Sequence, residues 1–314
     1  MKKLIISLLA ILSFSLNFLA QQTTNTNPET AKIVTSDIEL FWKAYDKATP
    51  ENNLNVFRDE YLRKGSVGLK DFTKLRIGNV CNLVGTIEAV PKYYAALREP
   101  SLKIASYENQ IRTAFRKLKE MYPDSVFPDV YFVIGIMNSG GTTSQNGLLI
   151  GVDMFGKNEG VLLDGLSNWH KAVLSPTERI PYIVAHELIH YEQKTVAQNS
   201  LLARSIKEGS ADFIAELISG DTINPHLHKY GNPIEKDLWL EFKKEMNGED
   251  VSNWLYQGDK AKDKPADLGY YMGYKICESY YKNAADKKQA VKDILEIQDF
   301  AKFLADSKYG EKFK

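Results

Sequence analysis

The stretch Ile180-Pro-Tyr-Ile-Val-Ala-His186-Glu187-Leu-Ile-His190 decides how this 314-residue chain is interpreted. His186 and His190 are four positions apart, so on a helix both imidazoles lie on one face and can bind the same metal ion. Glu187 points about a hundred degrees around that helix, where its carboxylate reaches a metal-bound water without ligating the metal. The apolar residues before His186 predict a buried helix, which rarely holds such polar groups without a partner. We therefore expect Zn²⁺ here, although a surface helix carrying the same three residues is the simpler alternative for so short a pattern.

The second helical segment, residues 205–217, offers the carboxylate that two histidines need. Glu208 follows His190 by 18 positions and would complete three protein ligands while a fourth position stays open. Asp212 is one helical turn further on and can accept the free ring N–H of a ligand histidine. Glu216 is a competing ligand, but it lies about 12 Å from Glu208 along the helix axis, so the two cannot face one metal. A solvated helix carboxylate is the alternative interpretation of Glu208.

These motifs resemble a known group of enzymes. The pair His186-Glu-Leu-Ile-His190 and Glu208-Gly-Ser-Ala-Asp212 resembles the gluzincin metallopeptidases, which include the thermolysin-like enzymes. A broader part of the chain resembles a family of predicted, largely uncharacterised zinc-dependent proteases of bacterial envelopes. The stretches that carry this resemblance are HELIHYEQ (186–193), IKEGSADFIAEL (206–217) and LGYYMGYKICESYY (268–281). It implies an α+β, mostly helical zincin-like fold with a small β-sheet and a zinc-dependent peptidase activity.

In the reaction that we expect, zinc lowers the pKa of its bound water, and Glu187 takes the proton and passes it to the leaving amine. The developing oxyanion needs a further donor, and Tyr270 is the preferred candidate. It opens Tyr270-Tyr-Met-Gly273, which is similar to the Y-x-x-G of a class of zinc aminopeptidases. Other candidates for this donor remain open: Tyr271, Tyr274, His226, His228 and, least favoured, His170.

A peptide or protein substrate is expected to pair with a β-strand near the zinc helix. The segment Leu148–Val152 precedes that helix, where gluzincins carry an edge strand that binds extended substrate. No G-x-M-E-N motif is present, which argues against a strict aminopeptidase. The sequence thus predicts an exported zinc metallopeptidase. Two alternatives are a zinc hydrolase of a non-peptide envelope amide and a non-catalytic envelope binding protein on a zincin scaffold. The intact Glu187 argues against the last, because a structural zinc site needs no base.

The beginning of the chain predicts export. Residues 1–20 have the pattern of a signal peptide, with Lys2 and Lys3 before an apolar run and Ala20 at the expected cleavage site. No cysteine follows the run, so we expect no lipid or other stable membrane anchor. We expect the protein to be periplasmic or secreted. Residues 21–30 are polar and are expected to form a disordered linker. The whole chain has 40 basic and 40 acidic side chains, which gives no reason to expect a nucleic-acid partner.

The remaining chain is divided by a change of periodicity. We expect a helical N-terminal lobe (31–122), a sheet and zinc-helix core (123–225) and a helical C-terminal lobe (226–314). Residues 130–136 and 147–152 predict two buried strands with a Gly/Ser/Thr-rich loop between them. Cys81 and Cys277 either pair or remain free thiols, since the sequence does not give their separation. The sequence also leaves the oligomeric state open.

Overall fold

The computed structural model describes residues 25–313 and has the expected α+β architecture, mostly helical with a small mixed sheet. The predicted signal peptide lies outside the described residues. The four strands are β1 (Ile33–Val34), β2 (Val130–Val133), β3 (Gly141–Ser144) and β4 (Gly147–Gly151). They are arranged in the order β1-β2-β4-β3, with β1, β2 and β4 parallel and β3 antiparallel to β4.

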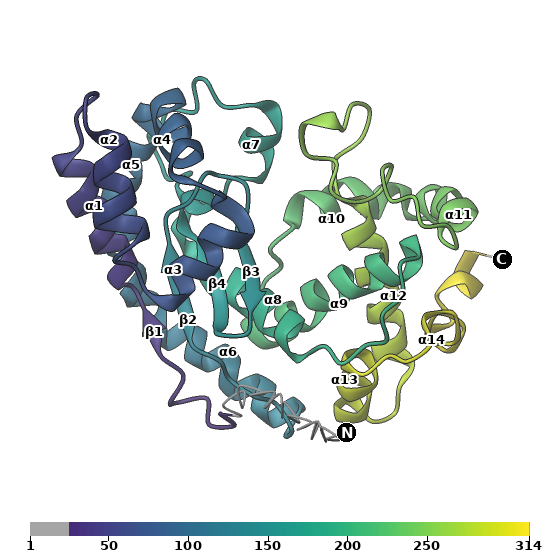
Figure 1. Cartoon of the computed structure of the whole chain (residues 1–314). Coiled ribbons are helices and arrows are strands. Elements are labelled where there is room, and N and C mark those ends of the chain that lie inside the picture. The colour runs from purple at the N-terminus through teal and green to yellow at the C-terminus, as the bar shows by residue number, and fades with distance from the viewer. Residues whose placement is uncertain (1–24, 314) are drawn as a thin grey trace, which may run out of the picture.

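The helices between β1 and β2 are coloured from purple to blue (Figure 1). They are α1 (Ser36–Lys47), α2 (Asn53–Val56), α3 (Val67–Phe72), α4 (Val80–Ala89), α5 (Pro91–Leu102) and α6 (Glu108–Met121). The helices after the sheet are α7 (Asn168–Val173), α8 (Ile180–Glu192), α9 (Leu201–Ser219), α10 (Pro225–Gly231), α11 (Glu235–Glu245), α12 (Leu268–Asn283), α13 (Lys287–Leu295) and α14 (Phe300–Ser307). Figure 1 shows α8 and α9 between the sheet and the C-terminal helices.

The sheet is covered on both faces, which explains its apolar sequence. All residues of β2 and β4 are buried, as expected for strands with a helix on each side. On one face, Gly68 of α3 packs against the side chain of Tyr131. On the other face, Gly141 of β3 packs against Glu187 of α8. The sheet therefore places its edge strand β3 directly beside the helix that carries both histidines.

The hairpin of β3 and β4 corrects two expectations. The Gly/Ser/Thr-rich segment is not a loop, because residues 141–144 form β3. Consequently β4, which covers the expected edge strand at Leu148–Val152, lies inside the sheet between β2 and β3. The sequence of β3 does not indicate a strand, because its residues are polar and half-buried. They show no alternation of hydrophobic and polar side chains.

The predicted strand at 130–136 is too long, because it ends at Val133. After that point, side chains take over the backbone hydrogen bonds. Tyr61 accepts from the N–H of Ile134, and the buried carboxylate of Asp153 accepts from Gly135 and Met137. These contacts replace a ladder of strand bonds and turn the chain towards β3.

Two other regions differ from or extend what the sequence suggested. Residues 25–30 form a hydrogen-bonded turn, and Glu29 pairs with Arg116 of α6, so this described part is ordered rather than the disordered linker expected for 21–30. Cys81 is exposed in α4 and Cys277 is buried in α12, and both are free thiols. In the described part of the chain, no helix is long and apolar enough to cross a membrane.

Candidate metal centre

The site is built on two adjacent helices whose sequences fix their ends. Helix α8 has Pro181 in its first turn and is buried along almost its whole length. Helix α9 begins after Ser200, whose side chain accepts from the N–H of Ala203, and ends at Gly220 in the left-handed conformation. The pairing of these helices brings residues that are 18 positions apart into contact.

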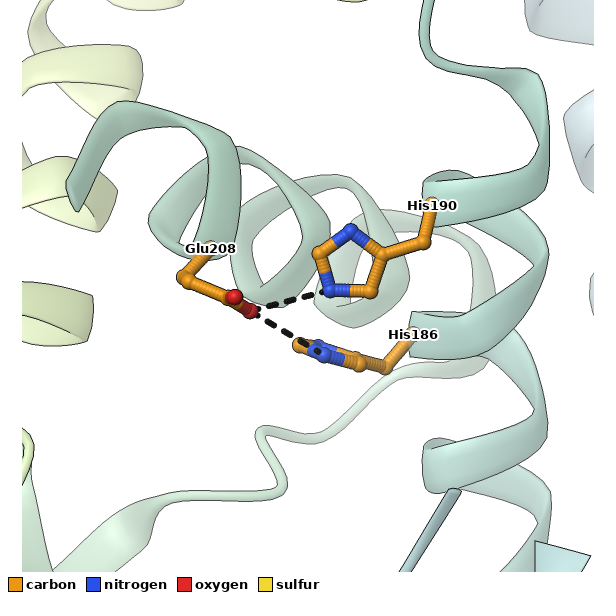
Figure 2. A group of neighbouring side chains, drawn as sticks. All are labelled: His186, His190 and Glu208. Atoms are coloured by element: carbon orange, nitrogen blue, oxygen red, sulfur yellow. Dashed lines mark hydrogen bonds and ion pairs between the residues drawn. The ribbon is translucent and has the colours of Figure 1, made fainter. Parts of the chain in front are cut away.

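His186, His190 and Glu208 point towards one another (Figure 2). The carboxylate Oε2 of Glu208 lies 3.0 Å from Nε2 of His190 and 4.0 Å from Nε2 of His186. The two imidazole rings are nearly perpendicular, with centroids 4.5 Å apart. One donor atom from each of the three residues lies within 4.8 Å of the other two, which is the arrangement that can hold a metal ion.

The other nitrogen of each ring lies close to a side-chain oxygen. Nδ1 of His186 lies 2.8 Å from Oδ1 of Asp212, whose second oxygen accepts from Asn224 at 2.7 Å. Nδ1 of His190 lies 3.0 Å from the side-chain oxygen of Gln193. Contacts of this kind keep the proton on Nδ1 and leave Nε2 free for a metal. The donor set and its supporting contacts therefore fit a zinc ion with two imidazoles and one carboxylate.

Glu208 and His190 also influence each other's charge. Burial by itself lowers the pKa of His190, but the neighbouring Glu208 carboxylate outweighs burial and raises this pKa. Burial raises the pKa of Glu208, but the two histidines outweigh that effect and lower it. Without a metal, the pair is thus held as imidazolium and carboxylate.

Glu187 lines the same cavity as the two histidines and packs against the sheet. It is 5% exposed, and a side chain at Gly141 would overlap its carboxylate. Burial raises the pKa of Glu187, and the two neighbouring histidines oppose this shift. Glycine is needed at position 141 because a side chain there would displace Glu187.

Tyr270 and Tyr256 are the tyrosines that line the site. The ring of Tyr270, in α12, is nearly parallel to that of His186, with centroids 6.3 Å apart. The hydroxyl of Tyr256 donates to Oε1 of Glu208 at 2.8 Å. Sequence reasoning missed Tyr256, because it lies in an irregular segment with no motif. Gln193 is part of the quoted HELIHYEQ stretch, but its role also went unrecognised.

The competing candidates are directed elsewhere. Glu216 accepts from the hydroxyl of Tyr274 at 2.9 Å, and Tyr271 contacts Asn232. His228 packs against the rings of both tyrosines, with centroids 5.5 and 4.4 Å away. Two further histidines also lie apart from the cluster: His170 contacts the carbonyl of Met137, and His226 lines a smaller neighbouring cavity.

A cavity of about 610 Å³ opens onto the cluster. Its walls include β3, the Met154–Phe155 segment and the aromatic rings of Trp169 and Tyr270. Arg76 and Lys207 also line it. Neither cation forms an ion pair within residues 25–313, so the cavity presents unpaired positive charge next to the metal-binding face.

Comparison with protein families gives a match over residues 21–245 to the family described as the gliding motility protein GldB. The matched segment covers well over half of the chain and includes α8, α9 and all four strands. No curated protein and no solved structure matches the chain.

This match overturns the predicted activity. The family is one of gliding motility lipoproteins rather than metallopeptidases, so the prediction of a zinc-dependent metallopeptidase is wrong, as is the resemblance on which it depended. HExxH is too short to specify hydrolysis, because its spacing only places two histidines and a glutamate on a helix. The catalytic roles predicted for Glu187 and Tyr270 depended on that activity.

The family also bears on where the protein acts. Its description as a lipoprotein family indicates an envelope location, which agrees with the prediction from the sequence that the protein acts outside the cytoplasm. The length of the match leaves no ambiguity about membership. The chain belongs to the family of the gliding motility protein GldB.

Proposed function

We propose that this protein is a non-catalytic binding component of the cell envelope that supports gliding motility. The observation that carries the proposal is the family match over residues 21–245. In this proposal the predicted signal peptide exports the chain, and the mature protein acts on the periplasmic or outer side of the membrane. The test is deletion of the gene in a gliding bacterium that carries it. Colony spreading should be lost and should return with the intact gene. Normal spreading of the deletion strain would contradict the proposal.

Within this function, His186, His190 and Glu208 would hold one Zn²⁺, with Asp212 supporting His186. The support is the convergence of three donor atoms and the separate partner on each Nδ1. A bound zinc would supply a Lewis-acidic centre with an open position towards the cavity. It would also replace the ion pair between His190 and Glu208, joining α8 to α9 by a stronger link.

The proposed partner is an extended segment of another envelope protein, bound along β3. The register supports this proposal. Gly151 donates to the carbonyl of Gly140, so hydrogen-bonded pairs alternate from that point. The N–H of Gly141 and both backbone groups of Thr143 therefore point to the free edge, whereas the carbonyl of Gly141 accepts from the hydroxyl of Ser139. An added strand would satisfy such groups and lie beside the metal cluster. The unpaired Arg76 and Lys207 favour an acidic segment.

Thr143 allows a sharp test of this partner. The variant Thr143→Pro removes one N–H on the free edge but no bond to β4, whereas Thr143→Val keeps that N–H. The probe is a fluorescent ten-residue peptide of alternating threonine and glutamate. We expect Thr143→Pro to weaken binding at least about tenfold and Thr143→Val to bind as the parent does. Absence of binding to the parent, or equal binding by Thr143→Pro, would contradict strand addition.

A further inference from the structure

The two oxygens of Glu208 have different partners. Oε2 faces the histidines, 3.0 Å from Nε2 of His190. Oε1 accepts a hydrogen bond from the hydroxyl of Tyr256 at 2.8 Å. A carboxylate can bind a metal through one oxygen or through both. Here the second oxygen is already occupied by a donor, which leaves Oε2 as the atom that faces the metal position.

Tyr256 reaches this position from outside the helix pair. It follows Trp254 and Leu255, which are buried and fix the segment between α11 and α12 to the core. Tyr256 itself is 56% exposed, so burial of its ring does not explain its placement. Its hydroxyl nevertheless extends over the cavity to Glu208.

The backbone at Tyr256 is strained. Its φ is 61°, in the left-handed region that bulky residues rarely adopt. The N–H of Tyr256 donates to the carboxylate of Asp267 at 2.5 Å, and Asp267 also has a positive φ of 67°. Such strain typically costs about 1–3 kcal/mol per residue and persists where surrounding contacts require it. The side chain of this strained residue forms the hydrogen bond with Glu208.

A second tyrosine–carboxylate pair provides a comparison. Tyr274 of α12 donates to Glu216 of α9 at 2.9 Å, on the same helix that carries Glu208. Glu216 is not part of the metal-binding cluster, and Tyr274 has no positive φ. The two hydroxyls thus make chemically similar bonds, but only the one from Tyr256 reaches a metal-binding carboxylate among the residues described.

We propose that Tyr256 is a positioning residue that restricts Glu208 to a single metal bond and thereby keeps one coordination position open to the cavity. This inference depends on the proposed metal site. It assigns a metal-tuning function to the segment between α11 and α12, which lies beyond the family match that ends at residue 245. The open position is where an oxygen of the bound partner segment would reach the metal.

The test uses Co²⁺ in place of Zn²⁺, because Zn²⁺ has no d–d spectrum. Tetrahedral cobalt has strong visible bands, which weaken when a fifth ligand atom binds. The variant Tyr256→Phe keeps the ring and removes the hydroxyl that occupies Oε1. We expect the cobalt bands of this variant to be weaker than those of the parent. We also expect it to release cobalt to a chelator about tenfold faster, which is the scale on which the loss of such a supporting contact weakens metal binding.

Tyr274→Phe is the matched control, because it removes a tyrosine–carboxylate bond of α9 that lies outside the cluster. It should keep the spectrum and release rate of the parent. Identical spectra for Tyr256→Phe and the parent would overturn the positioning role while leaving the metal site intact. Failure of the parent to bind cobalt at all would instead overturn the metal site, and the inference with it.

Discussion

Gly209 of α9 and Gly273 of α12 lie in direct backbone contact at the point where the two helices cross. A methyl group at Gly209 would overlap the backbone of Gly273 and Tyr274, and one at Gly273 would overlap the carbonyl of Ser205. Gly209 directly follows Glu208 in the chain. The close crossing therefore holds the turn that carries Glu208 against α12, and it positions the carboxylate for the histidines of α8.

This crossing predicts a large effect of a small substitution. Gly209→Ala should destabilise the protein by about 1–3 kcal/mol or more, because backbone atoms cannot move aside as a side chain can. The measurement is the free energy of unfolding in urea. Gly85→Ala in α4 is the control, since a methyl there meets no atom within 4 Å, and it should be neutral or slightly stabilising. Equal stabilities of the two variants would show that the crossing tolerates a larger separation.

The metal site predicts that the two histidines are both required. His186→Ala and His190→Ala should each lose zinc, because two remaining ligands hold the ion weakly. His228→Ala serves as the control, since this histidine packs against Tyr271 and Tyr274 outside the cluster. Elemental analysis after dialysis measures the metal content. One equivalent of zinc retained by both cluster variants would refute the ligand assignment.

The carboxylates of α9 should differ in their effects. Glu208→Ala should be nearly metal-free after exposure to a mild chelator, whereas Asp212→Ala should lose affinity by about 10- to 100-fold because it supports His186 without facing the metal. Glu216→Ala should match the parent, because Glu216 contacts Tyr274 instead. A titration in which a chelator competes for zinc gives the order of zinc affinities among the three variants. Zinc loss in Glu216→Ala with retention in Glu208→Ala would reverse the assignment.

The metal-free protein should have a pH-dependent stability that originates in one ion pair. The pKa of His190 is raised above its usual 6.5, so its contribution is fully present below pH 6.5 and is lost as the pH rises through the higher folded value. The pKa of Glu208 is lowered from 4.5, so its contribution is present above pH 4.5 and is lost in stronger acid. The pair should therefore stabilise most between about pH 4.5 and 6.5. Melting temperatures are measured with a chelator present. As the pH rises above 6.5, the melting temperature should fall less for His190→Ala than for the parent.

The sequence predicted the parts of the site that depend on local helical geometry. The four-residue spacing of His186 and His190, and the following carboxylates of α9, were sufficient to identify the residues that the fold brings together. Tyr256 could not be identified, since its position depends on a strained backbone and on Asp267, which are features of the tertiary fold. The edge strand β3 was missed because Gly-Thr-Thr-Ser has neither hydrophobic alternation nor β-branched apolar residues.

Function was less predictable than the fold. The same three residues on a helix serve a hydrolase or a binding protein, and the difference lies in what occupies the cavity rather than in the spacing. Glu187 illustrates this limit. Its presence suggested a catalytic base, but in the structure it is buried against Gly141, where it also fills the space between α8 and the sheet.

The most direct test of a non-catalytic role is therefore the response of gliding to Glu187→Gln. This substitution keeps the shape of the side chain and removes its capacity to act as a base. The variant gene is placed in the deletion strain, with protein amount and zinc content verified against the parent, and colony spreading is measured. The binding function predicts spreading equal to that restored by the parent gene. Loss of spreading by a folded, zinc-loaded Glu187→Gln protein would contradict it.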